Sequence, residues 1–293
     1  MIALRPVTLG ASSLGKRGTP ADVAALADAL VTSAYGQVDT SNNYAAGRSE
    51  AALGEAAART DARGAVFTKT DADPATGAHD GDRVKRSFEE SARRLGVERL
   101  PVLHLHDPGA LTLAEAMAPG GAVEALVALR EQGLVDAIGI ATGTRAVVEG
   151  FVRTDAFDAV LTHNRYTLVD RGAETILDLA AERGMAVFNG APFGGGILAD
   201  PSGERGSYGY RPASYALLGF IGRLRQLCEQ WGVALPAAAL HFSLREPRIH
   251  STVVGVSTLE RLDALDGLVA AQIPEGFFAA VDRLGSPPPT AND

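Results

Sequence analysis

Short apolar runs alternate along the chain with longer stretches in which apolar residues recur every three or four positions. The short runs are typical of buried parallel strands, and the longer stretches of amphipathic helices. We predict strands at Pro6–Leu9, Gln37–Thr40, Ala65–Lys69, Val102–His106, Ala137–Ile140, Ala159–Thr162, Ala186–Asn189 and Thr252–Gly255. We predict helices at Pro20–Ala34, Ser49–Arg59, Asp82–Leu95, Ala122–Gln132, Thr144–Val152, Ala173–Arg183, Ala213–Trp231 and Leu259–Val269, with an additional helix at Pro236–Leu244. This alternation predicts an α/β protein, a closed (β/α)8 TIM barrel.

The same pattern predicts a single domain. We place the barrel at residues 1–285 and expect the proline-rich residues 286–293 to form a flexible tail. A length of 293 residues is ordinary for one barrel. Two long loops, Asp71–Gly81 and Ala191–Ala213, each follow a strand and should therefore lie over the same mouth. Long ordered loops are usually functional, so these are candidate lid and specificity elements.

Composition narrows the function classes. The formal charge of −8, from 35 acidic and 27 basic residues, argues against a nucleic-acid-binding surface. The only cysteine, Cys228, lies in an apolar helical pattern and has no second cysteine with which to form a disulfide. No segment has the length or pattern of a signal peptide or a membrane span. We expect a cytoplasmic protein without nucleic-acid or membrane partners, present as a monomer or weak homodimer.

Four residues make the most specific chemical proposal. Asp39, Lys69 and His106 end predicted strands, and Tyr44 follows the first of these across a short turn. The carboxyl ends of barrel strands meet at one mouth, where barrel enzymes hold their active sites. An ammonium near a phenol favours the phenolate and can lower the pKa of the phenol, and a carboxylate can hold that ammonium. This set predicts a proton-transfer site, although each residue taken alone fits a structural role equally well.

The motifs VDTSNNYAAGRSEAALG, FTK, LHLHDP and APFGGGIL together resemble the aldo-keto reductase superfamily over most of the chain. VLTHNRYTLVDR and FNGAPFGGGILAD resemble its sugar-oxidising branch, which includes D-threo-aldose 1-dehydrogenase, L-fucose dehydrogenase and L-galactose dehydrogenase, with pyridoxal 4-dehydrogenase as a relative. The resemblance implies a nicotinamide-dependent oxidoreductase. Tyr44 would be the acid/base, Lys69 and Asp39 would tune it, and His106 would orient the substrate.

The resemblance also implies a cofactor site on the other strand ends. Cofactor contacts are expected at Thr142, His163, Ala191, Phe193, Gly194, Gly195, Gly196, Gly255, Ser257 and Arg261. Glycines allow backbone N–H groups to approach a pyrophosphate closely, although a glycine run alone also fits a hinge. Relatives that bind the 2′-phosphate often carry a basic residue near position 255. Here that residue is glycine, so we expect NAD, with NADP as the alternative.

Four positions depart from the family pattern. Ala141 and Thr142 replace the usual Ser–Asn pair, His163 replaces a glutamine, and Gly190 replaces the aromatic residue that stacks on the nicotinamide. Thr142 and His163 can still bond an amide, but the stacking surface is missing. The four proton-transfer residues are unaffected.

For the substrate we expect a free aldose, oxidised at its anomeric carbon to a lactone. Candidate substrate contacts are Asn43, Asp107 and Phe193, with Asn42 and Arg165 as further ligands for hydroxyl groups and Tyr208 and Tyr210 as pocket walls. The polar residues of this set fit solvated surface positions equally well. A general aldehyde or ketone reductase and a pyridoxal dehydrogenase are alternatives on the same site. More distant alternatives are a lyase that forms a Schiff base through Lys69, and a regulatory protein that binds the cofactor without turnover.

His104 and His106 lie two apart on one strand and therefore share a face, with Asp107 beside them. Further metal ligands are not evident at other strand ends, so we expect no metal site. His104 is instead expected to pack inside the barrel with a hydrogen-bond partner.

Overall fold

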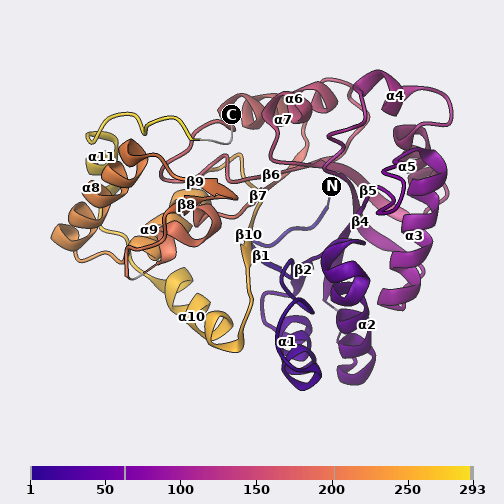
Figure 1. Cartoon of the computed structure of the whole chain (residues 1–293), viewed down its shortest axis with the longest axis horizontal. Coiled ribbons are helices and arrows are strands. Elements are labelled where there is room, and N and C mark those ends of the chain that lie inside the picture. Colours follow the sequence, from indigo (N-terminus) through magenta and orange to yellow (C-terminus); the bar gives the residue numbers. More distant parts are fainter. Residues whose placement is uncertain (1, 63, 201, 291–293) are drawn as a thin grey trace.

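A closed barrel of parallel strands forms the centre of the molecule, and helices ring it (Figure 1). The computed structural model describes residues 2–62, 64–200 and 202–290. The barrel strands run in the order β1-β10-β7-β6-β5-β4-β3-β2. They are β1 (Val7–Gly10), β2 (Gln37–Asp39), β3 (Ala65–Thr70), β4 (Leu100–His106), β5 (Val135–Ala141), β6 (Ala159–His163), β7 (Ala186–Gly190) and β10 (Ser251–Gly255). The predicted fold class is confirmed.

The predicted helices lie within a few residues of the observed ones. The helices are α1 (Pro20–Thr32), α2 (Arg48–Thr60), α3 (Gly81–Leu95), α4 (Leu113–Met117), α5 (Ala122–Glu131), α6 (Arg145–Val152), α7 (Glu174–Glu182), α8 (Tyr215–Trp231), α9 (Leu235–Leu244), α10 (Leu259–Ala270) and α11 (Phe277–Asp282). Three elements were not predicted: α4, α11 and the hairpin of β8 (Ser207–Tyr208) and β9 (Arg211–Pro212) in the long loop after β7. These elements are too short to show a hydrophobic period.

The apolar core has two parts. The larger one packs the outward faces of the strands against the helices, and a smaller cluster that includes Phe67, Leu161 and Phe188 fills the barrel. The rings of Phe67 and Phe188 meet edge to face, with centroids 5.5 Å apart. Side chains alternate across a strand, so the inward face that carries Phe67 on β3 also carries Lys69, one layer nearer the mouth. The packed interior thus forms the floor of the mouth.

His104 belongs to this interior layer and is fully buried. Its ring meets Phe188 edge to face at 5.5 Å, and a Cβ added to Gly139 would lie only 2.1 Å from its Nδ1. Burial, followed by the charge of Lys69, lowers the pKa of His104 well below its usual value, so the ring is neutral. Contrary to expectation, neither ring nitrogen has a hydrogen-bond partner among the described residues.

The end of the chain returns to the barrel. Thr290 is buried, and its hydroxyl donates a hydrogen bond of 2.7 Å to Asp170 Oδ2. At least this residue of the predicted tail is packed, while residues 291–293 lie outside the described part; tail flexibility stays a prediction. Among the described residues, no helix combines the length and the apolar character that a membrane span requires.

We expect Gly139→Ala to destabilise the protein because the new methyl group would overlap the His104 ring in a packed interior. Overpacking of this kind typically lowers the free energy of unfolding by about 1–3 kcal/mol. Gly222→Ala is the matched control, since Gly222 lies within α8 and no atom lies within 4 Å of the added Cβ. In urea denaturation the control should be unchanged or more stable by up to about 1 kcal/mol. Equal stability of the two variants would contradict the expected clash.

Candidate active site

Lys69 lies at the centre of the predicted proton-transfer group. Its side chain is 1% exposed, which excludes a surface lysine. Its Nζ donates hydrogen bonds of 2.7 Å to Asp39 Oδ2, 2.5 Å to the carbonyl oxygen of Thr40 and 3.4 Å to the Tyr44 hydroxyl. Burial alone would lower the pKa of Lys69, but Asp39 and Tyr44 outweigh it and raise that pKa above its ordinary value. The ammonium is therefore permanent, which disfavours a Schiff base, since that reaction needs a neutral amine.

The Tyr44 hydroxyl accepts a hydrogen bond from this ammonium, but the pKa of Tyr44 is not lowered as expected. Lys69 Nζ lies 4.7 Å from the centroid of the Tyr44 ring, and this proximity was expected to lower the pKa of Tyr44. Burial instead raises the pKa of Tyr44 to about 12, because the loss of hydration exceeds the attraction of Lys69, and Asp39 and Asp71 add further negative charge. In the unliganded site Tyr44 is thus a phenol that keeps its proton at neutral pH.

A strained turn places Tyr44 at the mouth. The short helix η1 (Tyr44–Gly47) contains Ala45 and Ala46 with φ of 54° and 56°, and Gly47 follows with φ of 84°. Alanine in the left-handed region is unfavourable, so the surroundings must impose this geometry. Strain of this kind is common at functional sites, where it fixes a side chain.

His106 has a partner that the sequence analysis missed. Its Nδ1 lies 2.7 Å from Asp71 Oδ1 and 3.1 Å from Ser41 Oγ, and its ring meets that of Tyr44 edge to face at 5.7 Å. Asp71 directly follows β3, so its position after a strand was the available signal. The structure brings Asp39, Tyr44, Lys69 and His106 together at one mouth as predicted, and we call them the tetrad.

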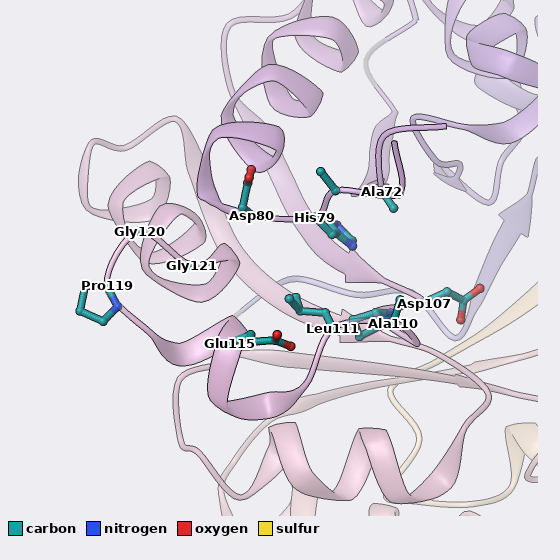
Figure 2. Close-up of a pocket in the computed structure, with 13 residues that line it drawn as sticks. Ala72, His79, Asp80, Asp107, Ala110, Leu111, Glu115, Pro119, Gly120 and Gly121 are labelled. Atoms are coloured by element: carbon teal, nitrogen blue, oxygen red, sulfur yellow. The ribbon is translucent and has the colours of Figure 1, made fainter. Parts of the chain in front are cut away.

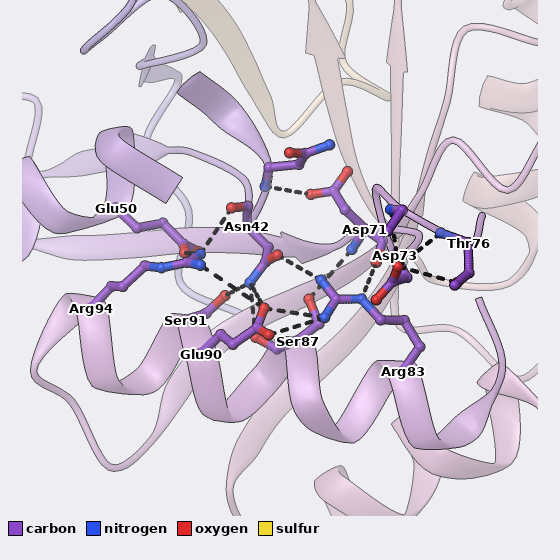
Figure 3. Close-up of polar contacts among 12 residues, drawn as sticks. Asn42, Glu50, Asp71, Asp73, Thr76, Arg83, Ser87, Glu90, Ser91 and Arg94 are labelled. Carbon is purple, nitrogen blue, oxygen red and sulfur yellow. Dashed lines mark hydrogen bonds and ion pairs between the residues drawn. The ribbon is translucent and has the colours of Figure 1, made fainter. Parts of the chain in front are cut away.

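A buried polar network supports the loop that leads to Tyr44 (Figure 3). Arg83, from α3, donates through Nε to the carbonyl oxygen of Asp71 at 2.9 Å and through Nη2 to Asn42 Oδ1 at 2.9 Å. Its Nη1 reaches Glu90 at 3.1 Å, and Arg94 Nη1 donates to the carbonyl oxygen of Asn42 at 3.0 Å. One guanidinium therefore ties the segment after β3 to the segment after β2. Asn42 is committed to this network and is not a substrate ligand, contrary to expectation.

Comparison with known proteins identifies the family. The model of the Aldo/keto reductase family matches residues 6–286. The chain belongs to the aldo-keto reductase family. Pyridoxal 4-dehydrogenase of Microbacterium luteolum is 29% identical over 94% of this chain and 93% of its own. D-threo-aldose 1-dehydrogenase of a Pseudomonas species is 34% identical over 67% of this chain and 60% of its own. L-galactose dehydrogenase of Arabidopsis thaliana is 26% identical over 62% of this chain and 56% of its own.

Solved structures confirm the fold. An aldo-keto reductase of Bacillus halodurans in its holo form superposes with a TM-score of 0.77 at 19% identity, covering 97% of this chain and 93% of that one. The glycerol dehydrogenase of Gluconobacter oxydans superposes with a TM-score of 0.73 at 19% identity, covering 96% of this chain and 91% of that one. The predicted family and its sugar-oxidising branch are confirmed, and the protein is an NAD(P)-dependent oxidoreductase.

In this aldo-keto reductase, the expected cofactor residues lie at or after the ends of β5, β6, β7 and β10, and we call this set the wall. β7 pairs with β10, so the segment Ala191–Gly196 lies beside Gly255 and the residues that follow it. Arg261 is exposed in the first turn of α10 and donates to Ser257 Oγ at 3.0 Å. No atom lies within 4 Å of a Cβ added to Gly255. An open surface with a cation and a helix N-terminus suits a dinucleotide phosphate.

The glycines Gly194–Gly196 have a packing role, which the sequence alone did not distinguish from anion binding. A Cβ on Gly194 would lie 2.4 Å from the Tyr208 ring, and one on Gly195 would lie 2.6 Å from the Gly209 carbonyl oxygen. The backbone N–H groups of Gly194 and Gly196 are bonded to the carbonyl oxygens of Ala191 and Phe193. These glycines allow the loop to fold against the β8–β9 hairpin.

Small residues surround His163 at the end of β6. A Cβ on Gly143 would lie 2.7 Å from His163 Cε1, and one on Gly190 would lie 3.0 Å from His163 Cβ. Thr142 is buried directly after β5, and its backbone N–H donates to the carbonyl oxygen of Leu161 on β6 at 3.1 Å. Tyr210 is 85% exposed and meets His163 edge to face at 6.0 Å, so an aromatic ring stands over the mouth from the hairpin.

Two further substrate-contact predictions are wrong. Tyr208 is 2% exposed, and its hydroxyl bonds Asn164 O at 2.9 Å and Thr167 Oγ1 at 2.9 Å, so it does not wall a pocket. Arg165 is 2% exposed and donates through Nε to Gly143 O at 2.8 Å, which makes it part of the scaffold. Burial of a polar side chain depends on distant residues and leaves no local pattern.

A cavity of about 390 Å³ lies between the loop after β3 and the segment after β4, and no member of the tetrad is among its lining residues. Figure 2 shows Ala72 and His79 on one side of it and Leu111 and Glu115 on the other. Asp107, whose Oδ2 lies 3.5 Å from His106 Nε2, lines the end nearest the tetrad. The expected contacts Asn43 and Asp107 are both exposed at the mouth, whereas Phe193 packs partly against the core.

We expect Arg83→Met to lower both stability and turnover, since it would leave Asn42 Oδ1 and the carbonyl oxygen of Asp71 without their donor. Loss of a buried charged hub of this kind lowers the free energy of unfolding by about 2–4 kcal/mol. The control is Arg86→Met, because Arg86 is exposed on the same helix. Denaturant titration of both variants checks this, and a loss in Arg83→Met no larger than in the control would contradict the role of the network.

Proposed function

We propose that the protein oxidises the anomeric carbon of a free aldose to a lactone. The single observation that carries this proposal is the tetrad, with its permanent ammonium beside a phenol and an imidazole at the open end of the barrel. A nicotinamide cofactor, when bound, would supply the hydride acceptor for the hydrogen at C1. Tyr44 contacts the reacting oxygen and exchanges its proton, and His106 orients that oxygen. The relatives named for aldose and galactose dehydrogenation support the substrate class.

The charge of the cavity favours a neutral sugar over a phosphorylated one. Three carboxylates, from Asp80, Asp107 and Glu115, are among its lining residues, and the described lining holds no lysine or arginine. His79 adds no positive charge, because burial lowers its pKa to about 4. Asp80 and Glu115 already accept hydrogen bonds as helix caps, which leaves the exposed Asp107 to bind a hydroxyl group. We infer that Asn43 and Phe193 complete the substrate site.

We propose that the wall formed by the ends of β5, β6, β7 and β10 binds the cofactor. Thr142 and His163 would bond the carboxamide, and Ala191, Phe193 and Gly194–Gly196 would cover the pyrophosphate. Gly255, Ser257 and Arg261 would face the adenosine ribose. NAD is preferred in this proposal because position 255 offers no cation, although Arg261 gives NADP a partner.

A substrate and cofactor screen tests the proposal. Purified protein is mixed with NAD or NADP and with L-fucose, L-galactose, D-arabinose or pyridoxal, and the absorbance of the reduced nicotinamide is followed. Reduction of NAD with one of the sugars is expected. Turnover with pyridoxal but with no sugar would replace the substrate class and retain the family reaction.

We expect Tyr44→Phe to lower turnover by about 100- to 10,000-fold because it removes the proton carrier while leaving the ring in place. A fluorescence titration should show unchanged cofactor binding. Tyr35→Phe is the matched control, since Tyr35 precedes β2 at the opposite end of the barrel and its hydroxyl donates to Asp266 Oδ1 at 2.8 Å, away from the tetrad. Wild-type turnover in Tyr44→Phe would remove the phenol from the mechanism.

We expect Gly255→Arg to shift cofactor preference towards NADP. The open space around Gly255 accepts a side chain, and a guanidinium there would pair with the 2′-phosphate. The ratio of kcat/KM for NADP over NAD should rise by about tenfold, the equivalent of one added charged contact. Gly267→Arg, on the open surface of α10, serves as a control for added charge. An unchanged ratio would place the ribose elsewhere.

A further inference from the structure

Tyr210 lies at the tip of the β8–β9 hairpin. The pair Tyr208–Arg211 closes the hairpin. Gly209 and Tyr210 between them form a two-residue turn, and Gly209 has the positive φ, 59°, that such a turn favours. The backbone N–H of Gly209 donates to the carbonyl oxygen of Gly194 at 3.0 Å, and the buried Tyr208 anchors the strand before it through its hydroxyl. The tip is therefore tied to the loop after β7.

The ring of Tyr210 is open although protein atoms surround it. The residue is 85% exposed, and its ring meets that of His163 edge to face with centroids 6.0 Å apart. Burial raises the pKa of the Tyr210 hydroxyl, the charge of Asp107 raises it further, and the charge of Lys69 lowers it. High exposure and crowding by protein atoms occur together when a ring stands free in a concave opening. The faces of this ring are therefore accessible to a flat ligand at the mouth.

The ring lies beside the position that we propose for the nicotinamide. On that proposal Thr142 and His163 bond the carboxamide, which is attached directly to the nicotinamide ring. Thr142 follows β5 and His163 ends β6, so the nicotinamide ring would lie over these strand ends. Tyr210 reaches the same place from the hairpin, because its ring meets that of His163. Two flat rings in such proximity gain free energy by packing together.

The charge of the nicotinamide differs between its two redox forms. The oxidised ring is a cation, and the reduced ring is neutral. The face of a phenol attracts a cation through its quadrupole. Asp107, whose charge acts on the Tyr210 hydroxyl, places a carboxylate at the same mouth. Both groups attract the oxidised ring, and neither offers the reduced ring a comparable attraction.

The cations near the mouth do not cancel this preference. Lys69 and Arg165 are each paired with a buried aspartate. Burial lowers the pKa of His163 below its ordinary value, so its imidazole adds no positive charge at neutral pH. Lys16 is exposed, and water screens its charge.

We propose that the ring of Tyr210 packs on the nicotinamide and, together with Asp107, favours binding of the oxidised cofactor over the reduced one. This inference rests on the proposed cofactor site. Tyr210 contacts the cofactor as a specificity-determining residue and exchanges no proton. The preference fills the site with the oxidised form. Tyr210 then holds the neutral, reduced ring less firmly, which favours its release and suits an enzyme that works in the direction of oxidation.

The test compares the dissociation constants of NAD⁺ and NADH, measured by calorimetry without a sugar. Tyr210→Leu removes the ring and keeps an apolar side chain, so we expect the affinity for NAD⁺ to fall about three- to tenfold more than the affinity for NADH. Tyr210→Phe keeps the ring face and should keep the wild-type ratio within about twofold. Tyr215→Leu is the matched control, because Tyr215 is 94% exposed at the first position of α8, and it should leave both affinities unchanged.

The outcomes are distinct. Equal weakening of both forms by Tyr210→Leu would assign the ring a structural role and overturn the inference. Unchanged cofactor affinities with a raised KM for the sugar would also overturn it, since the ring would then cover the substrate. A ratio lost in Tyr210→Phe as in Tyr210→Leu would show that the hydroxyl, and not the ring face, selects the oxidised form.

His163→Ala separates this inference from the cofactor site on which it rests. Weaker cofactor binding in His163→Ala, with no change in Tyr210→Leu, would overturn the inference alone. No change in either variant would overturn the proposed cofactor site as well. Because the affinities are measured without a sugar, a failure to oxidise any aldose would overturn the proposed substrate and leave this test intact.

Tyr210→Trp gives a spectroscopic readout of the same contact. An indole packed on an oxidised nicotinamide produces a charge-transfer absorption that neither ring has alone. The chain has a single tryptophan, Trp231, whose ring meets that of Phe277 at 6.0 Å, so wild type should show no such band. We expect the band in Tyr210→Trp with NAD⁺ and its absence with NADH. A Tyr210→Trp variant that binds NAD⁺ without the band would overturn the inference.

Discussion

The buried ion pair between Lys69 and Asp39 is the interaction on which the active site depends. An ammonium with 1% exposure is tolerated only because a carboxylate at 2.7 Å and the Thr40 carbonyl oxygen replace its water. These contacts join the ends of β2 and β3 and leave one direction for the third hydrogen bond, towards Tyr44. The pair therefore fixes where the phenol must lie, and the left-handed turn at Ala45 is the backbone geometry that brings it there. Removing either charged group would leave the other buried without its ion-pair partner, which would strongly destabilise the site.

Two fixed charges then determine which protons can move. Lys69 remains an ammonium because Asp39 holds it, and Asp71 remains a carboxylate because His106, Ser41 and the backbone donate to it. The phenol of Tyr44 and the imidazole of His106 lie between these fixed charges, and their rings meet edge to face with centroids 5.7 Å apart. Arg83 bonds the carbonyl oxygen of Asp71 after β3 and the side chain of Asn42 after β2, so it holds both segments in place. A buried guanidinium nitrogen without a hydrogen-bond acceptor would lower the stability of the protein. Here both terminal nitrogens of Arg83 have an acceptor.

The sequence was sufficient for features that repeat or that end a strand. Strand alternation predicted the barrel, and three strand-end residues together with the tyrosine predicted the proton-transfer group. Features that depend on total burial could not be predicted. The pKa of Tyr44 is set by lost hydration as well as by its charged neighbour, and the fates of Asn42 and Arg165 depend on helices far along the chain. The contact between Asp71 and His106 joins residues 35 positions apart, and only the register of β3 and β4 brings them together.

The barrel order separates the two halves of the proposed reaction by charge. β7 and β10, which carry the wall proposed for the cofactor, lie across the ring from β3 and β4, which carry the acidic cavity. On the proposed function, the cofactor phosphates meet Arg261 and the N-terminal end of α10, while the opposite side holds Asp107 and other carboxylates that repel phosphate. A dinucleotide bound in reverse would place its most negative part over the acidic cavity. The same separation explains how a protein with a net charge of −8 can bind an anionic cofactor, because the field at each strand end matters more than the total. On the proposed function, this arrangement would direct the hydride acceptor away from the phosphate end and towards the tetrad.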